Sequence, residues 1–214
     1  EYSVRGTAAI ALGLIRAADA VDSLAKALSD EEEFVQAEAA KALGAIGDKR
    51  AFESLSKVIE DKKSGWKVRL EGIRALGVLR DKRAISLLLA IFEEEFDTGE
   101  LGDEIKRALR NMRREIDFDA ASRALGKEDG DKNERARAAY LLGITGDPRA
   151  LDVLAATLED KEVYVRFASA RALIQLADVR AIPALSRALD REAHPRLRHY
   201  LYLGLSELRR KAKT

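Results

Sequence analysis

The stretch VQAEAAKALGAIGDKRAFESLSKVIED, residues 35–61, recurs along almost the whole chain. Its apolar, glycine and aspartate positions return in residues 68–92, 134–160 and 165–190. When the copies are aligned on the residue equivalent to Val35, they follow one another at intervals of 31–33 residues. The anchor residues of the copies are Val4, Val35, Val68, Leu101, Glu134, Val165 and Leu197. A period of this size, held from end to end, is typical of a solenoid of stacked repeats.

Each copy has the apolar spacing of two helices. Val35, Ala39 and Ile46 fall at helical rather than strand spacing, and the second half of the stretch behaves in the same way. Gly47-Asp48 separates the halves, because glycine can end one helix in the left-handed conformation and aspartate can accept the free amides that open the next. The sequence therefore predicts an all-α solenoid of about six and a half two-helix repeats. Because repeats share one continuous core, we expect a single domain over residues 1–214.

The first copy is incomplete. Residues 1–15 match the second helix of a repeat, with Val4, Ala8, Ala11, Leu12 and Ile15 on its inner face, and no first helix precedes them. This gives the hypothesis that the chain is a fragment of a longer one, or that another surface covers this end.

The amino-acid composition indicates the cellular compartment in which we expect the chain. The chain has no cysteine, which excludes disulfides and thiolate metal sites and favours a reducing compartment. No apolar run approaches the roughly 18 residues of a membrane span. We therefore expect a cytoplasmic protein without a membrane partner.

Charge is distributed unevenly along the chain. The net charge is +1, but residues 134–214 contain 15 Lys and Arg against 10 Asp and Glu, so the C-terminal third is basic. The fourth copy is irregular, because the segment from Glu93 to Glu104 carries seven acidic residues and two glycines. We interpret this acidic loop either as a solvated connection or as a docking loop inserted into the repeat, and its role stays open.

The common pattern VRxxAAxALGxIGDxRAxxxLxxxLxD resembles the HEAT repeat, in the short form named after the phycobilisome (PBS) lyases. Residues 68–77 and 165–176 match it best, and the fourth copy departs most. The resemblance implies a right-handed α-α superhelix with the first helices on the convex side and the second helices on the concave side. It also implies a ladder of internal ion pairs, here Asp61/Arg69, Asp160/Arg166 and Asp190/Arg198.

If the second helices line a concave face, the positions off their apolar stripe are exposed to a partner. The position six residues after the anchor carries a basic ladder in the second to fourth copies, namely Lys41, Arg74 and Arg107. Three residues before each of them stands an acid, Glu38, Glu71 or Glu104, at a spacing that allows pairing on one helix face. We therefore expect this part of the ladder to be neutralised.

Farther along the chain, the same positions carry aromatic and basic residues without interleaved acids. Such side chains are enriched where interfaces concentrate their binding energy. Trp66, with Leu70 and Val78, adds an apolar patch. The alternative is that some of these residues pack between repeats, Tyr164 and Phe167 above all. The predicted partner-binding residues are Trp66, Arg74, Arg107, Arg137, Tyr140, Tyr164, Phe167, Arg171, His199 and Tyr200.

The sequence offers little for catalysis. His194 and His199 are the only histidines, and a spacing of five residues does not align two ligands on one helical face. The HEAT-like iron hydroxylases depend on His-Glu dipeptides, which are absent here. Every Gly-Asp pair lies at a turn between helices, so we predict no phosphate-binding loop. We expect no enzyme, no catalytic residues, no cofactor and no metal.

Three functions remain as hypotheses. The first is a non-enzymatic scaffold that binds a protein or peptide, one with acidic residues, on the concave face. The second is nucleic-acid binding through the basic C-terminal half. The third is phycobilin lyase-like handling of a chromophore, which rests on the resemblance alone.

Overall fold

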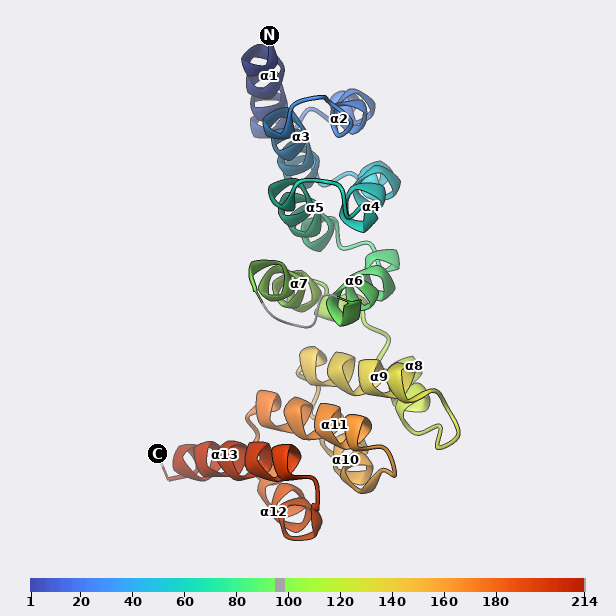
Figure 1. Ribbon diagram of the computed structural model, residues 1–214, viewed down its shortest axis with the longest axis vertical. Coiled ribbons are helices and arrows are strands. Elements are labelled where there is room, and N and C mark those ends of the chain that lie inside the picture. The colour runs from blue at the N-terminus through green and yellow to red at the C-terminus, as the bar shows by residue number, and fades with distance from the viewer. Residues whose placement is uncertain (95–98, 214) are drawn as a thin grey trace. The chain divides into compact units, whose positions relative to one another are not determined.

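The structure, a computed structural model, describes residues 1–94 and 99–213. Figure 1 shows that the chain is built from helices, and the described residues contain no strand. The all-α fold that the periodicity predicts is therefore confirmed. The helices group into two compact units, Glu1–Glu115 and Ile116–Thr214. That the whole chain forms a single domain stays a prediction.

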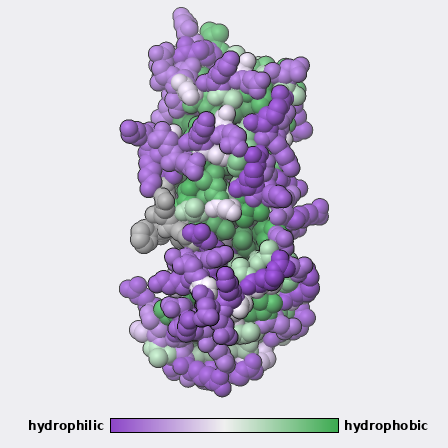
Figure 2. Space-filling view, turned by 90° about the vertical axis from the view of Figure 1, so that its right-hand side faces the viewer, coloured by the Kyte–Doolittle hydropathy of each residue, from purple (hydrophilic) through white to green (hydrophobic). Residues whose placement is uncertain are grey.

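In the first unit, second helices of successive repeats pack side by side, α1 on α3, α3 on α5 and α5 on α7. The first helices α2, α4 and α6 lie along one side of this row, and hydrophilic side chains predominate on the face that they present in Figure 2. The elements of this unit are α1 (Tyr2–Leu14), η1 (Ala18–Ala20), α2 (Val21–Ala27), α3 (Glu33–Ile46), η2 (Lys49–Ala51), α4 (Phe52–Glu60), α5 (Trp66–Leu79), α6 (Arg83–Glu94), α7 (Glu100–Asn111) and η3 (Arg113–Glu115).

The second unit repeats the arrangement, because α9 packs on α11, α11 packs on α13, and each second helix is paired with a first helix. Its elements are α8 (Phe118–Leu125), α9 (Lys132–Thr145), α10 (Ala150–Ala156), η4 (Thr157–Glu159), α11 (Val163–Leu176), η5 (Val179–Ala181), α12 (Ile182–Arg191) and α13 (Pro195–Lys211).

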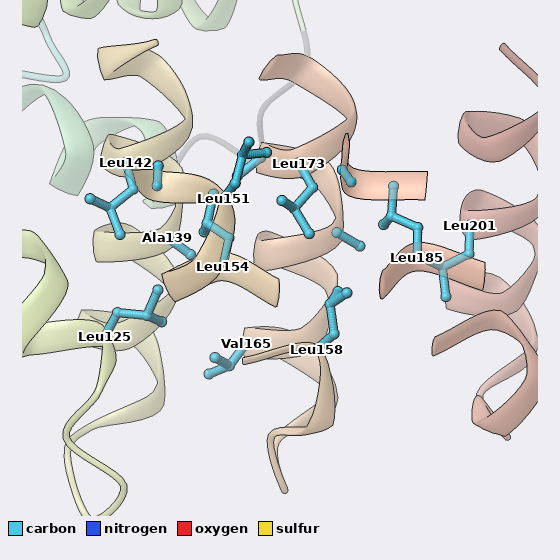
Figure 3. Packing of buried hydrophobic residues seen from close by; sticks show 14 of the residues in the cluster. Leu125, Ala139, Leu142, Leu151, Leu154, Leu158, Val165, Leu173, Leu185 and Leu201 are labelled. Atoms are coloured by element: carbon cyan, nitrogen blue, oxygen red, sulfur yellow. The ribbon is translucent and has the colours of Figure 1, made fainter. Parts of the chain in front are cut away.

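The core of the second unit lies between its two rows of helices. In Figure 3, Leu154 of α10 lies between Leu142 of α9 and Leu173 of α11, and Leu185 of α12 faces Leu201 of α13. All five side chains are buried. Burying one leucine side chain stabilises a fold by about 1.5–3 kcal/mol. This apolar layer holds the second helices in place and so positions the side chains on their outer face.

The predicted Gly-Asp turns are present. Gly47 and Gly146 have φ values of +74° and +67°, the left-handed conformation that ends a helix with least strain for glycine. The carboxylate of Asp48 accepts a hydrogen bond of 2.9 Å from the backbone N–H of Arg50 and so opens the next helical segment. The periodicity of the sequence and this turn chemistry together produce the helical pairs.

Two expectations about irregular segments need correction. The residues expected on the inner face of α1 are exposed, apart from Leu12. Instead, α1 buries Gly6, Ala9 and Gly13, because it packs on α3 with this side, where Gly6 faces Phe34 and Gly13 faces Ala42. In the acidic loop, α6 continues to Glu94 and α7 begins at Glu100, and residues 95–98 lie outside the described residues. The docking role of this loop stays a prediction.

Candidate binding surface

Four of the predicted binding residues meet on the second helices of the second unit. The guanidinium carbon of Arg171 on α11 lies 5.6 Å from the ring centre of Tyr140 on α9, within the range of a cation–π contact. The rings of Phe167 on α11 and Tyr200 on α13 lie 4.9 Å apart, tilted by 30°. These four residues, from three successive helices, are the aromatic cluster. The structure thus brings together residues that are up to 60 positions apart in the sequence.

Repeat position explains why these side chains gather. Tyr140 and Arg171 both stand six residues after the anchor of their copy, beside buried residues such as Ala139 and Ala170. They therefore lie at the margin of the buried stripe, and all four side chains of the cluster are half-buried. Phe167 also packs against the apolar core, so the alternative of packing between repeats is confirmed for this residue.

Burial changes the acidity of the Tyr200 hydroxyl. Desolvation raises the pKa of its hydroxyl above the usual 10.0, while the positive charge of Arg171 acts in the opposite direction. The phenol is therefore neutral at physiological pH and can donate a hydrogen bond. The aromatic cluster presents a cation, phenol hydroxyls and ring faces together.

Three further predicted residues lie on the same helices. Arg137 is half-buried on α9, and His199 is exposed on α13 next to Tyr200 in the sequence. Tyr164 is exposed in the first turn of α11. The structure places these residues on the second helices of the second unit, as expected, and their part in binding stays a prediction.

In the first unit, the basic residues of the predicted surface are compensated by acids. Arg74 lies 2.7 Å from Glu71 and 3.1 Å from Glu104, and Arg107 lies 3.1 Å from Glu104. Glu104 is only 5% exposed. The expected neutralisation is therefore confirmed for Arg74 and Arg107. Lys41, within the described part of the chain, forms no comparable pair with Glu38.

The predicted apolar patch around Trp66 is wrong. Trp66 begins α5 and is 57% exposed, but Leu70 is only 3% exposed and belongs to the core. Val78 is exposed near the other end of α5, about 18 Å along the helix axis from Trp66. Trp66 is therefore an isolated exposed ring on α5 and shares no patch with Val78.

The ion-pair ladder exists with different partners from those expected. Arg5 pairs with Asp30 at 2.7 Å, Arg166 with Glu192 at 2.8 Å, and Arg135 with Asp160. Each arginine follows the anchor of its copy and reaches the loop of the next repeat, 25 or 26 residues later.

The expected pairs Asp160/Arg166 and Asp190/Arg198 are therefore wrong. Arg166 donates to the backbone carbonyl of Asp160 at 2.8 Å, because the carboxylate of Asp160 is turned toward Arg135. Arg198 likewise donates to the backbone carbonyl of Glu192 at 3.3 Å. In the first unit, Arg69 is buried and donates to the carbonyl of Ile59 at 3.0 Å, and its pairing with Asp61 stays a prediction.

The helix turns contain a second set of ion pairs, which we did not predict from the sequence. Four turns carry an aspartate paired with the arginine two residues later, at 2.6–2.8 Å. The pairs are Asp48/Arg50, Asp81/Arg83, Asp147/Arg149 and Asp178/Arg180. The signal was the Asp-x-Arg motif that recurs at each of these turns.

These turn arginines join neighbouring first helices. Arg83 also pairs with Glu53 at 2.9 Å and covers the ring of Phe52 at 4.0 Å. Arg149 covers the ring of Phe118 at 4.1 Å in the same way. The turn arginines therefore strengthen the stacking of first helices, and we assign them a structural role.

Metal clusters and membrane-spanning helices are two further features that the described residues allow us to assess. Within residues 1–94 and 99–213, no group of His, Cys, Asp and Glu side chains is arranged to hold a metal ion. In the same residues, no helix combines the length and the apolar character needed to cross a bilayer.

The paired helices, their glycine–aspartate turns and the ladder of inter-repeat ion pairs define an α-solenoid of short two-helix repeats. Comparison with known families agrees, because HEAT repeats match residues 1–66 and 120–206, and the PBS lyase HEAT-like repeat matches residues 68–94. The chain belongs to the HEAT repeat family. The predicted HEAT-like solenoid is thereby confirmed.

Two solved structures are similar to this chain over most of its length. The chain is similar to the phycocyanin lyase complex of CpcE and CpcF from a Nostoc species, with 20% identity and a TM-score of 0.49 over 96% of this chain and 89% of that one. It is also similar to an archaeal HEAT-like repeats protein from Thermococcus onnurineus, with 14% identity and a TM-score of 0.48 over 95% and 92%. Such likenesses concern the fold and say nothing about binding or activity. No curated protein matches the chain.

Proposed function

We propose that this protein is a non-enzymatic scaffold that holds a protein or peptide on the face formed by α9, α11 and α13. The observation that supports the proposal is the aromatic cluster, in which three successive second helices contribute Tyr140, Arg171 and Tyr200 to one place. A repeat fold places equivalent residues side by side, and this face uses that property to collect tyrosine and arginine side chains.

The residue types favour a protein partner. Tyrosine and arginine are enriched among the residues that carry most of the binding energy of interfaces. The half-buried side chains of the aromatic cluster are already held by their neighbours, so little conformational entropy remains to be lost on binding.

Charge favours a partner that presents acidic residues. Arginine suits a carboxylate by its planar set of donors, and the C-terminal third of the chain has an excess of basic residues. In the first unit, Arg74 and Arg107 share the buried carboxylate of Glu104. We therefore place acid recognition on the second unit.

The proposal includes the absence of catalysis. The chain has no cysteine nucleophile, and its two histidines do not form a pair of ligands on one helix face. His194 has a structural role, because its Nδ1 accepts the backbone N–H of Leu197 at 3.5 Å and caps α13.

A selection experiment tests the proposal. A random peptide library is panned against the protein, and the affinity of a selected peptide is measured by calorimetric titration. We expect enrichment in Asp and Glu, and binding at least about fivefold weaker in Arg171→Gln, since truncating a central interface residue costs more than about 1 kcal/mol.

Arg187→Gln is the matched control, because Arg187 is an exposed arginine on α12, a first helix of the same unit. Both variants are first checked for an unchanged helical signal in circular dichroism. Selected peptides without an acidic bias, or equal binding by the two variants, would contradict the proposal.

Nucleic-acid binding is the second candidate, and the basic last turn of α13, with Arg209, Arg210 and Lys211, supports it. Contacts with phosphates would make the affinity fall steeply as salt is added. A gel-shift assay with DNA and RNA at two salt concentrations tests it, and the absence of a salt-sensitive shift would remove this candidate. The handling of a chromophore has no comparable observation in its favour.

A further inference from the structure

The second copy of the repeat departs from the ion-pair ladder at the residue directly after its anchor. Five of the seven copies carry arginine at this position, whereas the irregular fourth copy carries glycine and the second copy carries Gln36. Arg5, Arg135 and Arg166 each pair with an acid 25 or 26 residues later. The residue 25 positions after Gln36 is Asp61, so the second copy keeps the acid of the ladder but not the arginine.

Gln36 makes only one of the two kinds of contact that an arginine makes at this position. The guanidinium group of Arg166 donates to the backbone carbonyl of Asp160, six residues earlier in its own loop. It also donates to the carboxylate of Glu192 in the next loop, at 2.8 Å and 2.9 Å. The side-chain amide of Gln36 donates to the backbone carbonyl of Asp30, likewise six residues earlier. Because the glutamine side chain is shorter, within the described residues it makes the contact with its own loop and none with the carboxylate of the next.

The carboxylate of Asp61 is held by the same local hydrogen bond as the acid of a complete pair. Its Oδ1 accepts the backbone N–H of Lys63 at 2.9 Å, and Oδ1 of Asp160 accepts the backbone N–H of Glu162 at 2.8 Å. The other oxygen of Asp160, Oδ2, pairs with Arg135. Asp61 is exposed, whereas the side chain of Asp160 is only 6% exposed. Asp61 is therefore positioned as a ladder acid and is open to a ligand.

A polar cavity lies at this position of the second copy. It has a volume of about 740 Å³, and both Gln36 and Asp61 line it. The corresponding cavity of the second unit is lined by the pair Arg135 and Asp160 and is smaller, at about 500 Å³. The first unit therefore offers more space at the place where the ladder has glutamine instead of arginine. We call the larger space the ladder cavity.

Carboxylates from two successive repeats meet at the ladder cavity. A Cβ atom on Gly65 would meet the carboxylate of Glu33, so Glu33 reaches from α3 to the loop that contains Asp61. Glu33 and Asp61 both line the cavity. Lys57 and Lys63 line it as well, but they are exposed, and their long side chains can extend into water. The cavity therefore presents two carboxylates to a cation.

We propose that the ladder cavity binds the guanidinium group of an arginine side chain supplied by a partner chain. The guanidinium group pairs with Asp61 and Glu33 and so completes the ladder in the second copy. Arginine suits this place better than lysine, because its planar donors match a carboxylate with two parallel hydrogen bonds. The site belongs to the first unit and does not depend on acid recognition at the aromatic cluster.

A titration with small ligands tests the proposal. N-acetyl-L-arginine amide, which presents an arginine side chain without terminal charges, is added to isotope-labelled protein and followed by NMR. N-acetyl-L-citrulline amide is the comparison, because it has nearly the same shape and no charge. We expect saturable shifts of the backbone amides of Asp61, Lys63 and Ser64 with the arginine ligand. The citrulline ligand should bind at least about fivefold more weakly, because charge-assisted hydrogen bonds are lost.

Two variants of the protein sharpen the test. Asp61→Asn should weaken binding of the arginine ligand at least about fivefold. Gln36→Arg should abolish it and raise the melting temperature, because the new side chain reaches Asp61 as Arg5 reaches Asp30. Asp22→Asn is the matched control, since Asp22 is an exposed aspartate on α2 that does not line the cavity. This control should titrate like the unchanged protein.

Three results would overturn the proposal. The first is the absence of saturable shifts with the arginine ligand. The second is equal binding of the citrulline ligand, or of the corresponding lysine ligand, because either would show that the planar cation is not what the cavity recognises. The third is unchanged affinity in folded Asp61→Asn and Gln36→Arg, with the helical signal checked by circular dichroism.

Discussion

At the scale of single residues, an arginine directly after the anchor links one repeat to the next in three copies, through Arg5, Arg135 and Arg166. Arg135 and Asp160 show this most fully, because their side chains are only 3% and 6% exposed. Two charges at such depth are costly to desolvate, so the pair depends on mutual attraction and on further hydrogen bonds. The guanidinium group of Arg135 donates one of these to the backbone carbonyl of Glu128 at 3.2 Å.

We predict that Asp160→Asn destabilises the second unit by about 3–5 kcal/mol, because it leaves a buried guanidinium without its counter-charge. Urea unfolding followed by circular dichroism measures the loss. Glu159→Gln is the matched control, since Glu159 and its partner Arg191 are well exposed, and this change should cost about 0–1 kcal/mol. Equal losses of unfolding free energy in the two variants would show that burial does not determine how much an ion pair contributes to stability.

The titration of Tyr200 reports on the aromatic cluster. Burial raises its pKa, and the charge of Arg171 opposes that rise. We predict that Arg171→Gln raises the pKa of Tyr200 further, because a positive charge that favours the phenolate is removed. Ultraviolet difference absorbance against pH, with Tyr200→Phe to assign the signal, measures it. An unchanged pKa of Tyr200 in this variant would contradict the prediction, because it would show that the charge of Arg171 does not act on the hydroxyl.

At the scale of elements, close contact between second helices depends on small residues. A Cβ atom on Gly44 would lie 2.9 Å from the Cα atom of Ala75 on the next second helix. Gly77 with Ala108, and Gly143 with Ala172, repeat the contact with distances of 2.8 Å and 3.0 Å. The glycines that the repeat pattern contains inside its helices therefore set the distance between repeats.

We predict that Gly44→Ala destabilises the first unit by about 1–3 kcal/mol, because the new methyl group meets backbone that cannot give way. Gly126→Ala is the control, since Gly126 has a φ value of −75° and room for a Cβ atom. The control should be neutral or stabilising by about 0.4–1 kcal/mol through the unfolded chain. Thermal melts compare the two, and a smaller effect at Gly44 would contradict the tight contact.

The elements were predictable from the sequence because their signals are local. Val35, Ala39 and Ile46 repeat at helical spacing, and Gly47-Asp48 carries the chemistry of a turn, so helices and turns follow without reference to the rest of the chain. The partners of the ladder were not predictable in the same way. Asp160 and Arg166 are near in sequence, but the orientation of the loop turns one carboxylate toward Arg135 of the preceding repeat.

The candidate site was predictable in part. Repeat position alone placed Tyr140 and Arg171 side by side, because both stand six residues after their anchors and equivalent positions of stacked helices are neighbours. Tyr200 stands three residues after its anchor, another position that was expected on the same face. Leu70 was predicted to belong to an exposed patch but is buried, because the width of the buried stripe depends on how closely the next helix approaches.

At the scale of the whole molecule, both units rely on carboxylates with lowered pKa values. In the turns, hydrogen bonds from arginine side chains lower the pKa values of Asp48 and Asp81 in the first unit and of Asp147 and Asp178 in the second. Arg166 lowers the pKa of Glu192 by the same kind of contact. These groups bind protons more weakly in the folded state than in the unfolded state.

We therefore predict that stability is fully present above the unfolded pKa values, near 4, and is lost as the pH falls through the lower folded values. Urea unfolding between about pH 6 and pH 3 measures this dependence. Asp178→Asn should make the stability of the second unit depend less on pH, because it removes one of the carboxylates that bind a proton on acid unfolding. A stability that stays constant or rises toward pH 3 would contradict the prediction.

Mapping a bound peptide on the protein tests the central claim most directly. An acidic peptide from the selection is added to isotope-labelled protein, and chemical-shift changes are followed by NMR for backbone amides and aromatic rings. We predict the largest changes at Tyr140, Phe167, Arg171 and Tyr200 on α9, α11 and α13. Changes confined to the first helices α10 and α12, with these four residues unaffected, would contradict the account.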